Sequence, residues 1–210
     1  MSKRTNEESI DFENILIENA LLDDLFYYKD LKDRKIFFNE IINDDSVFPV
    51  VRHIMDINKQ DKGISAEDRK PIWIYISSPG GDVESGFSLI DAIISSKTPV
   101  YTVNIGDNYS MGFLLGLAGH KRYTFKNSRF LLHDGFECIY DSASKAEDRK
   151  KFTNEIDNRL KDYVLQRTKI TSQKYSRNRR KEWYMFADQA KELGVVDYII
   201  GEDVEMEEIL

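Results

Sequence analysis

At positions 72–81 the sequence is IWIYISSPGG, a run of β-favouring residues followed by a turn with two adjacent glycines. A near-continuous apolar run of this kind is typical of a strand that is covered on both faces. The following residues, 85–96, are predicted to form a helix. The same order recurs where a strand over 100–105 leads through Gly106 to a helix over 111–118. This alternation predicts an α/β domain with a mostly parallel central sheet.

The remaining segments extend this pattern, apart from one long charged region. Short strands are predicted at 36–38, 123–125, 130–132 and 195–200, and helices at 11–29, 46–59, 172–181 and 187–193. Residues 1–10 are predicted to be disordered, and residues 202–208 form an acidic tail. Residues 143–169 contain no Gly or Pro and carry one narrow apolar stripe, made of Phe152, Ile156, Leu160 and Val164. A long helix with so thin a stripe is expected to pack outside the main core, with another subunit as the candidate partner.

Composition excludes several classes of protein. The chain has 210 residues, enough for one domain with a sizeable core, and its formal net charge is −7. This charge argues against general binding of nucleic acid or an anionic membrane, since both need a basic surface. We expect no membrane helix, which needs roughly 20 apolar residues, and no secretory signal in residues 1–11. The single cysteine, Cys138, excludes an internal disulfide and is interpreted as a semi-buried filler. The cytoplasm is therefore the expected location.

Two glycine-bearing segments could supply a nucleophile and oxyanion donors. In IGDNYSMG, at positions 105–112, Ser110 closes a glycine-flanked turn and precedes an apolar helix, whose first N–H groups are unpaired. Its alternative role is an ordinary helix N-cap. The pair Gly80 and Gly81 forms either a simple tight turn or a place where backbone N–H groups approach a substrate. Both segments fall at the carboxyl ends of predicted parallel strands, where sites form.

Among the three histidines, His133 is the best candidate for a general base. It ends the apolar run 130–132 and precedes a turn signal, although a histidine there could also be a satisfied core residue. His53 and His120 are interpreted as structural or solvated. No Cys/His spacing resembles a metal site, so neither a metal nor a cofactor is expected. The sequence therefore favours a serine hydrolase, in which a base activates the serine hydroxyl and donors hold the oxyanion.

Taken together, these segments resemble the proteolytic subunit of the Clp protease, the ClpP family of serine peptidases, as a divergent member. The resemblance covers about residues 34–200 and rests on SSPGG at 77–81, YSMG at 109–112, NSRFLLH at 127–133 and ADQAKELGVVD at 187–197. It implies the repeated β-β-α units of the ClpP/crotonase-like fold, with a protruding handle helix at about 143–169 that joins two rings. Residues 1–33 would then be an N-terminal polar segment with an axial helix, and 34–210 the peptidase domain.

The resemblance also implies the site residues. Ser110 would be the nucleophile and His133 the general base, and the backbone N–H groups of Gly81 and Met111 would form the oxyanion hole. The family's third catalytic member is an aspartate, and Glu182 stands at that position here. Glutamate can fill this role; otherwise Glu182 is a surface carboxylate that pairs with neighbouring basic residues.

The leading hypothesis is a serine endopeptidase subunit of a self-compartmentalising ring, which cleaves unfolded polypeptide through an acyl-enzyme without ATP at the site itself. It implies a homo-oligomer of stacked rings and an AAA+ unfoldase as a candidate partner. Glu182 and the polar pair Asp107-Asn108 motivate an alternative, a weak or inactive ring subunit that modulates a partner. A phage-type maturation protease of the same fold stays open, whereas the Ser/His pairing disfavours a crotonase-like binder of acyl-coenzyme A. Substrate preference and ring size are left open by the sequence.

Overall fold

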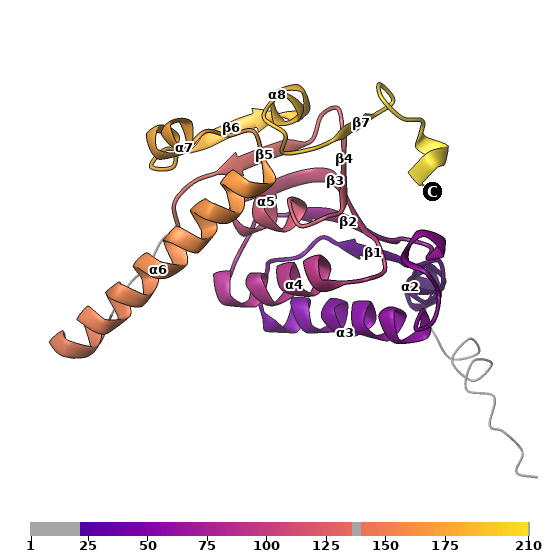
Figure 1. The fold of residues 1–210 in the computed structure, drawn as a ribbon, viewed down its shortest axis with the longest axis horizontal. Helices are drawn as coiled ribbons and strands as arrows, with labels where there is room; N and C mark the ends of the chain where they lie inside the picture. Colours follow the sequence, from indigo (N-terminus) through magenta and orange to yellow (C-terminus); the bar gives the residue numbers. More distant parts are fainter. Residues whose placement is uncertain (1–21, 136–139, 210) are drawn as a thin grey trace, which may run out of the picture. The chain divides into compact units, whose positions relative to one another are not determined.

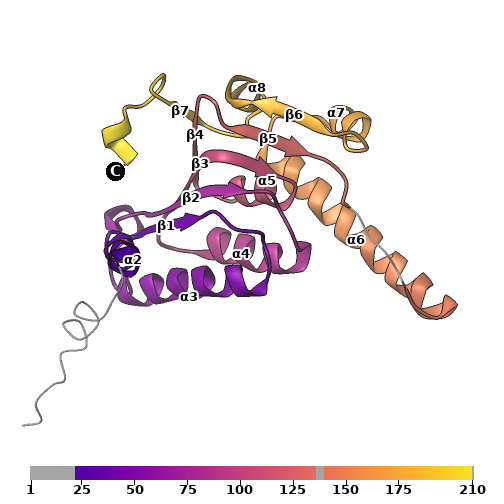
Figure 2. The same cartoon turned by 180° about the vertical axis from the view of Figure 1, so that it is seen from behind.

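The computed structural model describes residues 22–135 and 140–209 (Figures 1 and 2). The chain divides into two compact units, of which the first ends at Lys35 and the second begins at Ile36. In the first unit, α2 (Leu22–Lys32) is a helix of 11 residues. It overlaps the helix predicted over 11–29 and continues to Lys32.

Three expectations fall outside the described residues. They are the disorder of residues 1–10, the first part of the helix predicted from Asp11, and the environment of Cys138. The division of the chain into an axial segment, 1–33, and a peptidase domain, 34–210, stays a prediction.

A central sheet organises the strands in the described part of the chain. The strands are β1 (Lys35–Phe38), β2 (Ile72–Ser78), β3 (Val100–Tyr109), β4 (Lys121–Phe125), β5 (Arg129–Leu132), β6 (Trp183–Phe186) and β7 (Tyr198–Ile200). Their order is β1-β2-β3-β4-β7, with β5 paired to β3 and β6 paired to β5. The pairs β2–β3, β3–β4, β3–β5 and β4–β7 are parallel, and only β5–β6 is antiparallel among the pairs whose register is known. The prediction of an α/β fold with a mostly parallel sheet is confirmed.

Helices pack along the sheet and close the core. They are α3 (Asp44–Gln60), α4 (Val83–Ser95), α5 (Met111–Gly116), α6 (Ala143–Arg167), α7 (Ser172–Asn178) and α8 (Ala187–Glu192), with short 3₁₀ turns η1 (Ala66–Asp68) and η2 (Met206–Ile209). Both views show α3 and α4 side by side along β1 and β2. Ile74 of β2 and Leu89 of α4 have no exposed surface, and Tyr75 is buried on the other face of β2. None of the described helices is long and apolar enough to cross a membrane.

The sheet divides at β3, and this division positions the site. The first half of β3 pairs with β4, and its last residues, Asp107–Tyr109, pair with β5. β3 is therefore longer than the strand predicted over 100–105, because β5 binds the backbone of these last residues. Ser110 follows β3 directly and His133 follows β5 directly. Since these strands are parallel neighbours, both residues lie at the same edge of the sheet.

β6 was not predicted, and it has the largest consequence for the site. Its four residues, WYMF, are all apolar or aromatic, so no alternation of polar and apolar residues marks them as a strand, and only Met185 is buried. The strand forms because the antiparallel ladder with β5 satisfies its backbone groups, pairing Leu132 with Trp183. This pairing brings Glu182, which precedes β6, next to His133.

Two differences concern the C-terminal region. The strand predicted over 195–200 is confined to β7. The acidic segment 202–208 runs into η2, whose Ile209 is buried in a cluster with Tyr75 and Tyr123. The hydroxyl of Tyr75 donates a hydrogen bond to the carbonyl of Ile209. The acidic segment is thus followed by an apolar anchor.

The long helix predicted over 143–169 is present as α6, with 25 residues. Its C-terminal half packs on α5: Val164 is fully buried, and the hydroxyl of Tyr163 donates to the carbonyl of Leu114 over 3.1 Å. Its N-terminal half is exposed, including Phe152 at 57%. Figures 1 and 2 show this half extending away from the sheet. Its role as a handle between rings stays a prediction.

Candidate functional site

Ser110 adopts a backbone conformation that residues with a side chain rarely adopt. Its φ is 54° and its ψ −119°. Such a conformation costs about 1–3 kcal/mol and persists only where the surroundings impose it. Here the N–H of Ser110 donates to the carbonyl of Leu131 over 2.9 Å, and its own carbonyl accepts from the N–H of Leu114 over 3.3 Å. Although Ser110 occupies the N-cap position of α5, its hydroxyl makes no capping hydrogen bond, which weakens the alternative of a simple cap.

The glycine pair lies against this turn and cannot carry side chains. A Cβ at Gly80, where φ is +100°, would lie 2.7 Å from the carbonyl oxygen of Tyr109 and 2.8 Å from Ser110 Cβ. A Cβ at Gly81 would lie 2.2 Å from the carbonyl oxygen of Ile42. The N–H of Ile42 donates to the carbonyl of Gly80, and the N–H that follows Gly81 donates to the carbonyl of Ile42. The turn is therefore fixed from both sides.

Two backbone donors at this place have no acceptor among the residues that the structure describes. Within the described residues, neither the N–H of Gly81 nor that of Met111 takes part in a backbone hydrogen bond. Met111 is the first residue of α5, so its N–H lacks an acceptor within the helix. Both residues line one pocket together with Ser110. Unpaired N–H groups beside a serine are suited to binding an oxyanion.

His133 and Glu182 form a pair across the end of the β5–β6 ladder. The last ladder position pairs Leu132 with Trp183, so His133 and Glu182 are opposed at the next position. His133 Nδ1 lies 3.0 Å from Glu182 Oε1. The imidazole side chain is 27% exposed and the carboxylate side chain 58% exposed. A carboxylate at Nδ1 favours the tautomer that carries its proton there, which leaves Nε2 free to accept a proton.

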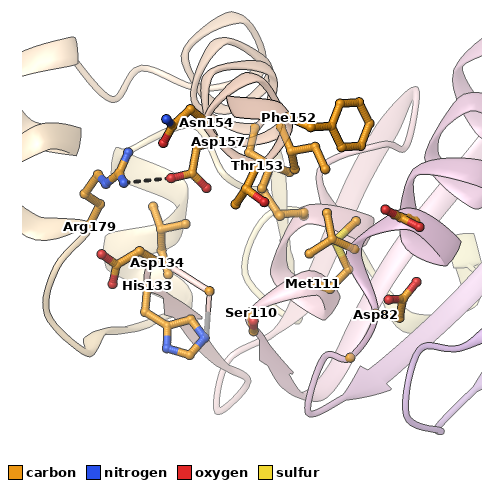
Figure 3. Close-up of a pocket in the computed structure, with 18 of the residues that line it drawn as sticks. Asp82, Ser110, Met111, His133, Asp134, Phe152, Thr153, Asn154, Asp157 and Arg179 are labelled. Carbon is orange, nitrogen blue, oxygen red and sulfur yellow. Dashed lines mark hydrogen bonds and ion pairs between the residues drawn. The ribbon is translucent and has the colours of Figure 1, made fainter. Parts of the chain in front are cut away.

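Ser110 and His133 share the pocket but are not hydrogen-bonded to each other in the described part of the chain. Figure 3 shows both side chains at the base of the pocket, below α6. Asp134 also lines the pocket, and its backbone N–H donates a hydrogen bond to the carbonyl of Arg179. Catalytic hydrogen bonds are often long before substrate binds. The separation of the Ser110 and His133 side chains is therefore compatible with a Ser–His–acid arrangement.

The pocket has a volume of about 540 Å³, and both apolar and charged side chains line it. Its apolar lining includes Met111 and Leu114 of α5 and Ile156 and Leu160 of α6. Its charged lining includes Asp82, Glu84, Arg149, Lys150, Asp157 and Arg179. The apolar stripe of α6, which predicted packing outside the core, thus serves partly to wall this pocket. The role of α6 in lining the pocket was not predicted, because the spacing of its apolar residues does not indicate which surface they face.

The structure brings the predicted site residues together. The pocket is lined by Gly81, Ser110, Met111 and His133. Glu182 does not line it but contacts His133. His120 Nδ1 lies instead beside the backbone of Val100, at the far end of β3. Among the described residues there is no group of three or more His, Cys, Asp or Glu side chains that could hold a metal ion.

Comparison with known proteins gives a consistent result. The family model of the Clp protease matches residues 22–203. The chain is 30% identical over 178 residues to the ATP-dependent Clp protease proteolytic subunit 2 of Treponema pallidum (strain Nichols), which covers 84% of this chain and 86% of the relative. It is also 30% identical over 172 residues to the protein of the same name from Bacillus licheniformis, which covers 81% and 87%. The matched region contains Ser110, His133 and Glu182.

Proposed function

Because the chain belongs to the Clp protease family, we propose that it is a serine endopeptidase subunit whose catalytic residues are Ser110, His133 and Glu182. The observation that carries this proposal is the strained serine, whose hydroxyl caps nothing and which shares a pocket with His133, the partner of Glu182. A positive φ costs less conformational free energy for glycine than for serine. A serine kept in that conformation supports a nucleophilic role.

The reaction is peptide hydrolysis in two steps. His133 Nε2 takes the proton of Ser110 Oγ as the oxygen attacks the scissile carbonyl carbon. The N–H groups of Gly81 and Met111 stabilise the negative charge on the carbonyl oxygen. His133 then gives its proton to the leaving amine, and an acyl ester on Ser110 remains. A water molecule, deprotonated by His133, attacks the ester. His133 then gives this proton to Ser110 Oγ as the ester bond breaks and the acid leaves.

Glu182 orients His133 and stabilises the imidazolium that forms during each step. The 3.0 Å contact at Nδ1 supports this role. Its glutamate side chain has one more methylene than the aspartate expected from the family. The contact between Glu182 and His133 at the end of the β5–β6 ladder supports glutamate in this role.

The substrate in this proposal is unfolded polypeptide, and the active form is a homo-oligomer of stacked rings. The exposed N-terminal half of α6, with Phe152 at 57% exposure, supports an interface through residues 143–169. An AAA+ unfoldase is the proposed partner and the cytoplasm the proposed location. The names of the two relatives describe those proteins as ATP-dependent.

A second candidate is a weak or inactive ring subunit that modulates a partner peptidase. The missing Ser110–His133 hydrogen bond and the 58% exposure of the Glu182 side chain favour it. It shares the fold and assembly of the first candidate and differs only in the state of the serine. The two are therefore separated by measuring the reactivity of Ser110.

Fluorophosphonate labelling of the wild type and of Ser110→Ala tests the proposal, with intact mass and light scattering on both. We expect labelling of a large oligomer that is lost in Ser110→Ala, while assembly is retained. Glu182→Gln should lower peptide cleavage by roughly 10²–10⁴-fold. Cleavage that persists in Ser110→Ala would overturn the assignment, and an assembled but unlabelled wild type would favour the second candidate.

A further inference from the structure

One face of β3, β5 and β6 carries the His133–Glu182 pair and two tyrosines. Tyr109 is opposite Leu131 in the β3–β5 ladder, and Leu131 is opposite Tyr184 in the β5–β6 ladder. Side chains alternate along a strand, so His133 lies on the face of Leu131, and Glu182 on the face of Tyr184. The two tyrosines therefore stand next to the proposed acid and base.

The two carboxylate oxygens of Glu182 have different partners. Oε1 lies 3.0 Å from His133 Nδ1, and Oε2 accepts a hydrogen bond of 3.4 Å from the hydroxyl of Tyr184. Within the described residues these are the recorded hydrogen bonds of the Glu182 carboxylate. A half-exposed glutamate has three rotatable bonds and can turn its carboxylate into solvent. The Tyr184 hydroxyl is the contact that restrains the second oxygen.

The ring of Tyr184 is itself supported by Tyr109. Their ring centroids lie 5.8 Å apart with an interplanar angle of 87°, an edge-to-face contact over Leu131. Burial, followed by the neighbouring Asp107 carboxylate, raises the pKa of Tyr109 above its ordinary value. Asp107 is in turn paired with Arg129 Nε over 2.6 Å. The ion pair, Tyr109 and Tyr184 thus form a series of neighbouring groups that ends at Glu182.

We propose that Tyr184 is a positioning residue, whose hydroxyl holds the Glu182 carboxylate in contact with His133. The inference rests on the proposed function and extends it. A glutamate has one more rotatable bond than an aspartate, and Tyr184 removes the freedom that this bond adds. Asp107 and Tyr109, which precede the nucleophile, act in this arrangement as the support of the ring.

The variant Tyr184→Phe tests this role, because it keeps the ring and its contact with Tyr109 and removes only the hydroxyl. We expect kcat for peptide cleavage to fall about three- to tenfold with KM unchanged. The rate of Ser110 labelling should fall by a similar factor across the pH range in which histidine titrates. The matched control is Tyr198→Phe on β7, whose ring stacks on Tyr123 at 5.1 Å and whose loss of a hydroxyl should leave both rates unchanged.

A double-mutant cycle separates positioning from a purely structural effect. In a Glu182→Asp background the shorter carboxylate cannot reach Tyr184, so adding Tyr184→Phe should change kcat no further. A structural role would lower kcat by the same factor in both backgrounds, and that result would overturn the inference. Wild-type kcat in Tyr184→Phe alone would overturn it as well.

Crystal structures of the wild type and of Tyr184→Phe provide a readout that does not depend on activity. We expect the Glu182 carboxylate to leave His133 in the variant. An unmoved carboxylate contradicts the positioning role even if Ser110 is reactive. A wild type that fails to label contradicts the proposed function instead, and the two structures still decide the role of Tyr184.

Discussion

Replacing Gly80 by alanine tests how the turn beside the nucleophile is built. A Cβ there would lie 2.7 Å from the carbonyl oxygen of Tyr109, 2.8 Å from Ser110 Cβ and 3.0 Å from the backbone N of Met111. Two of these three atoms belong to the backbone and cannot rotate away as the end of a flexible side chain can. The added methyl group must therefore displace the segment that carries Ser110.

The expected destabilisation has two parts. Placing alanine at φ +100° costs about 1–2 kcal/mol, and forcing a methyl group into close-packed surroundings costs about 1–3 kcal/mol. Gly63 separates the two, because its φ is +99° and a Cβ there would meet nothing within 4 Å. Gly63→Ala should show only the backbone cost. The free energy of unfolding of the two variants should differ by about 1–3 kcal/mol, or about 2–12 °C in Tm for a chain of this size.

The assay is thermal and urea unfolding of both variants at equal protein concentration, because assembly itself changes apparent stability. The rate of fluorophosphonate labelling is then measured at a temperature where both variants are folded. We expect Gly63→Ala to label like the wild type and Gly80→Ala to label at least about tenfold more slowly, since the oxyanion donors and the serine shift together. Equal midpoints for the two variants, with wild-type labelling of Gly80→Ala, would refute the reasoning.

Three further substitutions test other parts of the structure. Arg167→Met removes the guanidinium that donates to carbonyl groups at the end of α5, and should lower the free energy of urea unfolding by about 1–3 kcal/mol. Burial raises the pKa of Tyr123 from 10.0 to about 12, so the unfolded chain loses this proton at a lower pH than the folded chain. The free energy of unfolding of the wild type should therefore fall as pH rises from 10 to 12. Urea midpoints should show a smaller fall for Tyr123→Phe over the same range. Asp82→Ala removes the N-cap of α4 and should cost about 1 kcal/mol at neutral pH. Because hydrogen bonds from Ser85 lower the pKa of Asp82 below 3.8, the cost should become smaller in urea titrations at pH values below that shifted pKa.

The strands and helices that could be predicted are those with a strong local pattern. The run 72–76 and the stripes of 46–59 and 85–96 depend on residues a few positions apart, and they form β2, α3 and α4. β6 has no such pattern, since Met185 is its only buried residue. Its existence depends on the free edge of β5, more than 50 positions earlier in the chain.

The site residues also differ in whether a local sequence pattern could predict them. Ser110 and His133 could be proposed as candidates because each follows a predicted strand at the edge where sites form. Glu182 became a candidate only through the resemblance to a family. Its contact with His133 spans 49 positions and requires the β5–β6 ladder. Tyr184 was not proposed at all, because a tyrosine in a short, exposed segment gives no local sign of its partner.

The sequence by itself determined the alternation of strands, glycine turns and helices, and with it the edge of the sheet that bears Ser110 and His133. These features follow from interactions between near neighbours, such as backbone preference at glycine and burial of periodic apolar residues. Only the tertiary structure decided that Ser110 has a positive φ, that α6 walls the pocket and that Glu182 reaches His133. Each of these depends on the pairing of distant segments, whose register is set by the packing of the whole sheet.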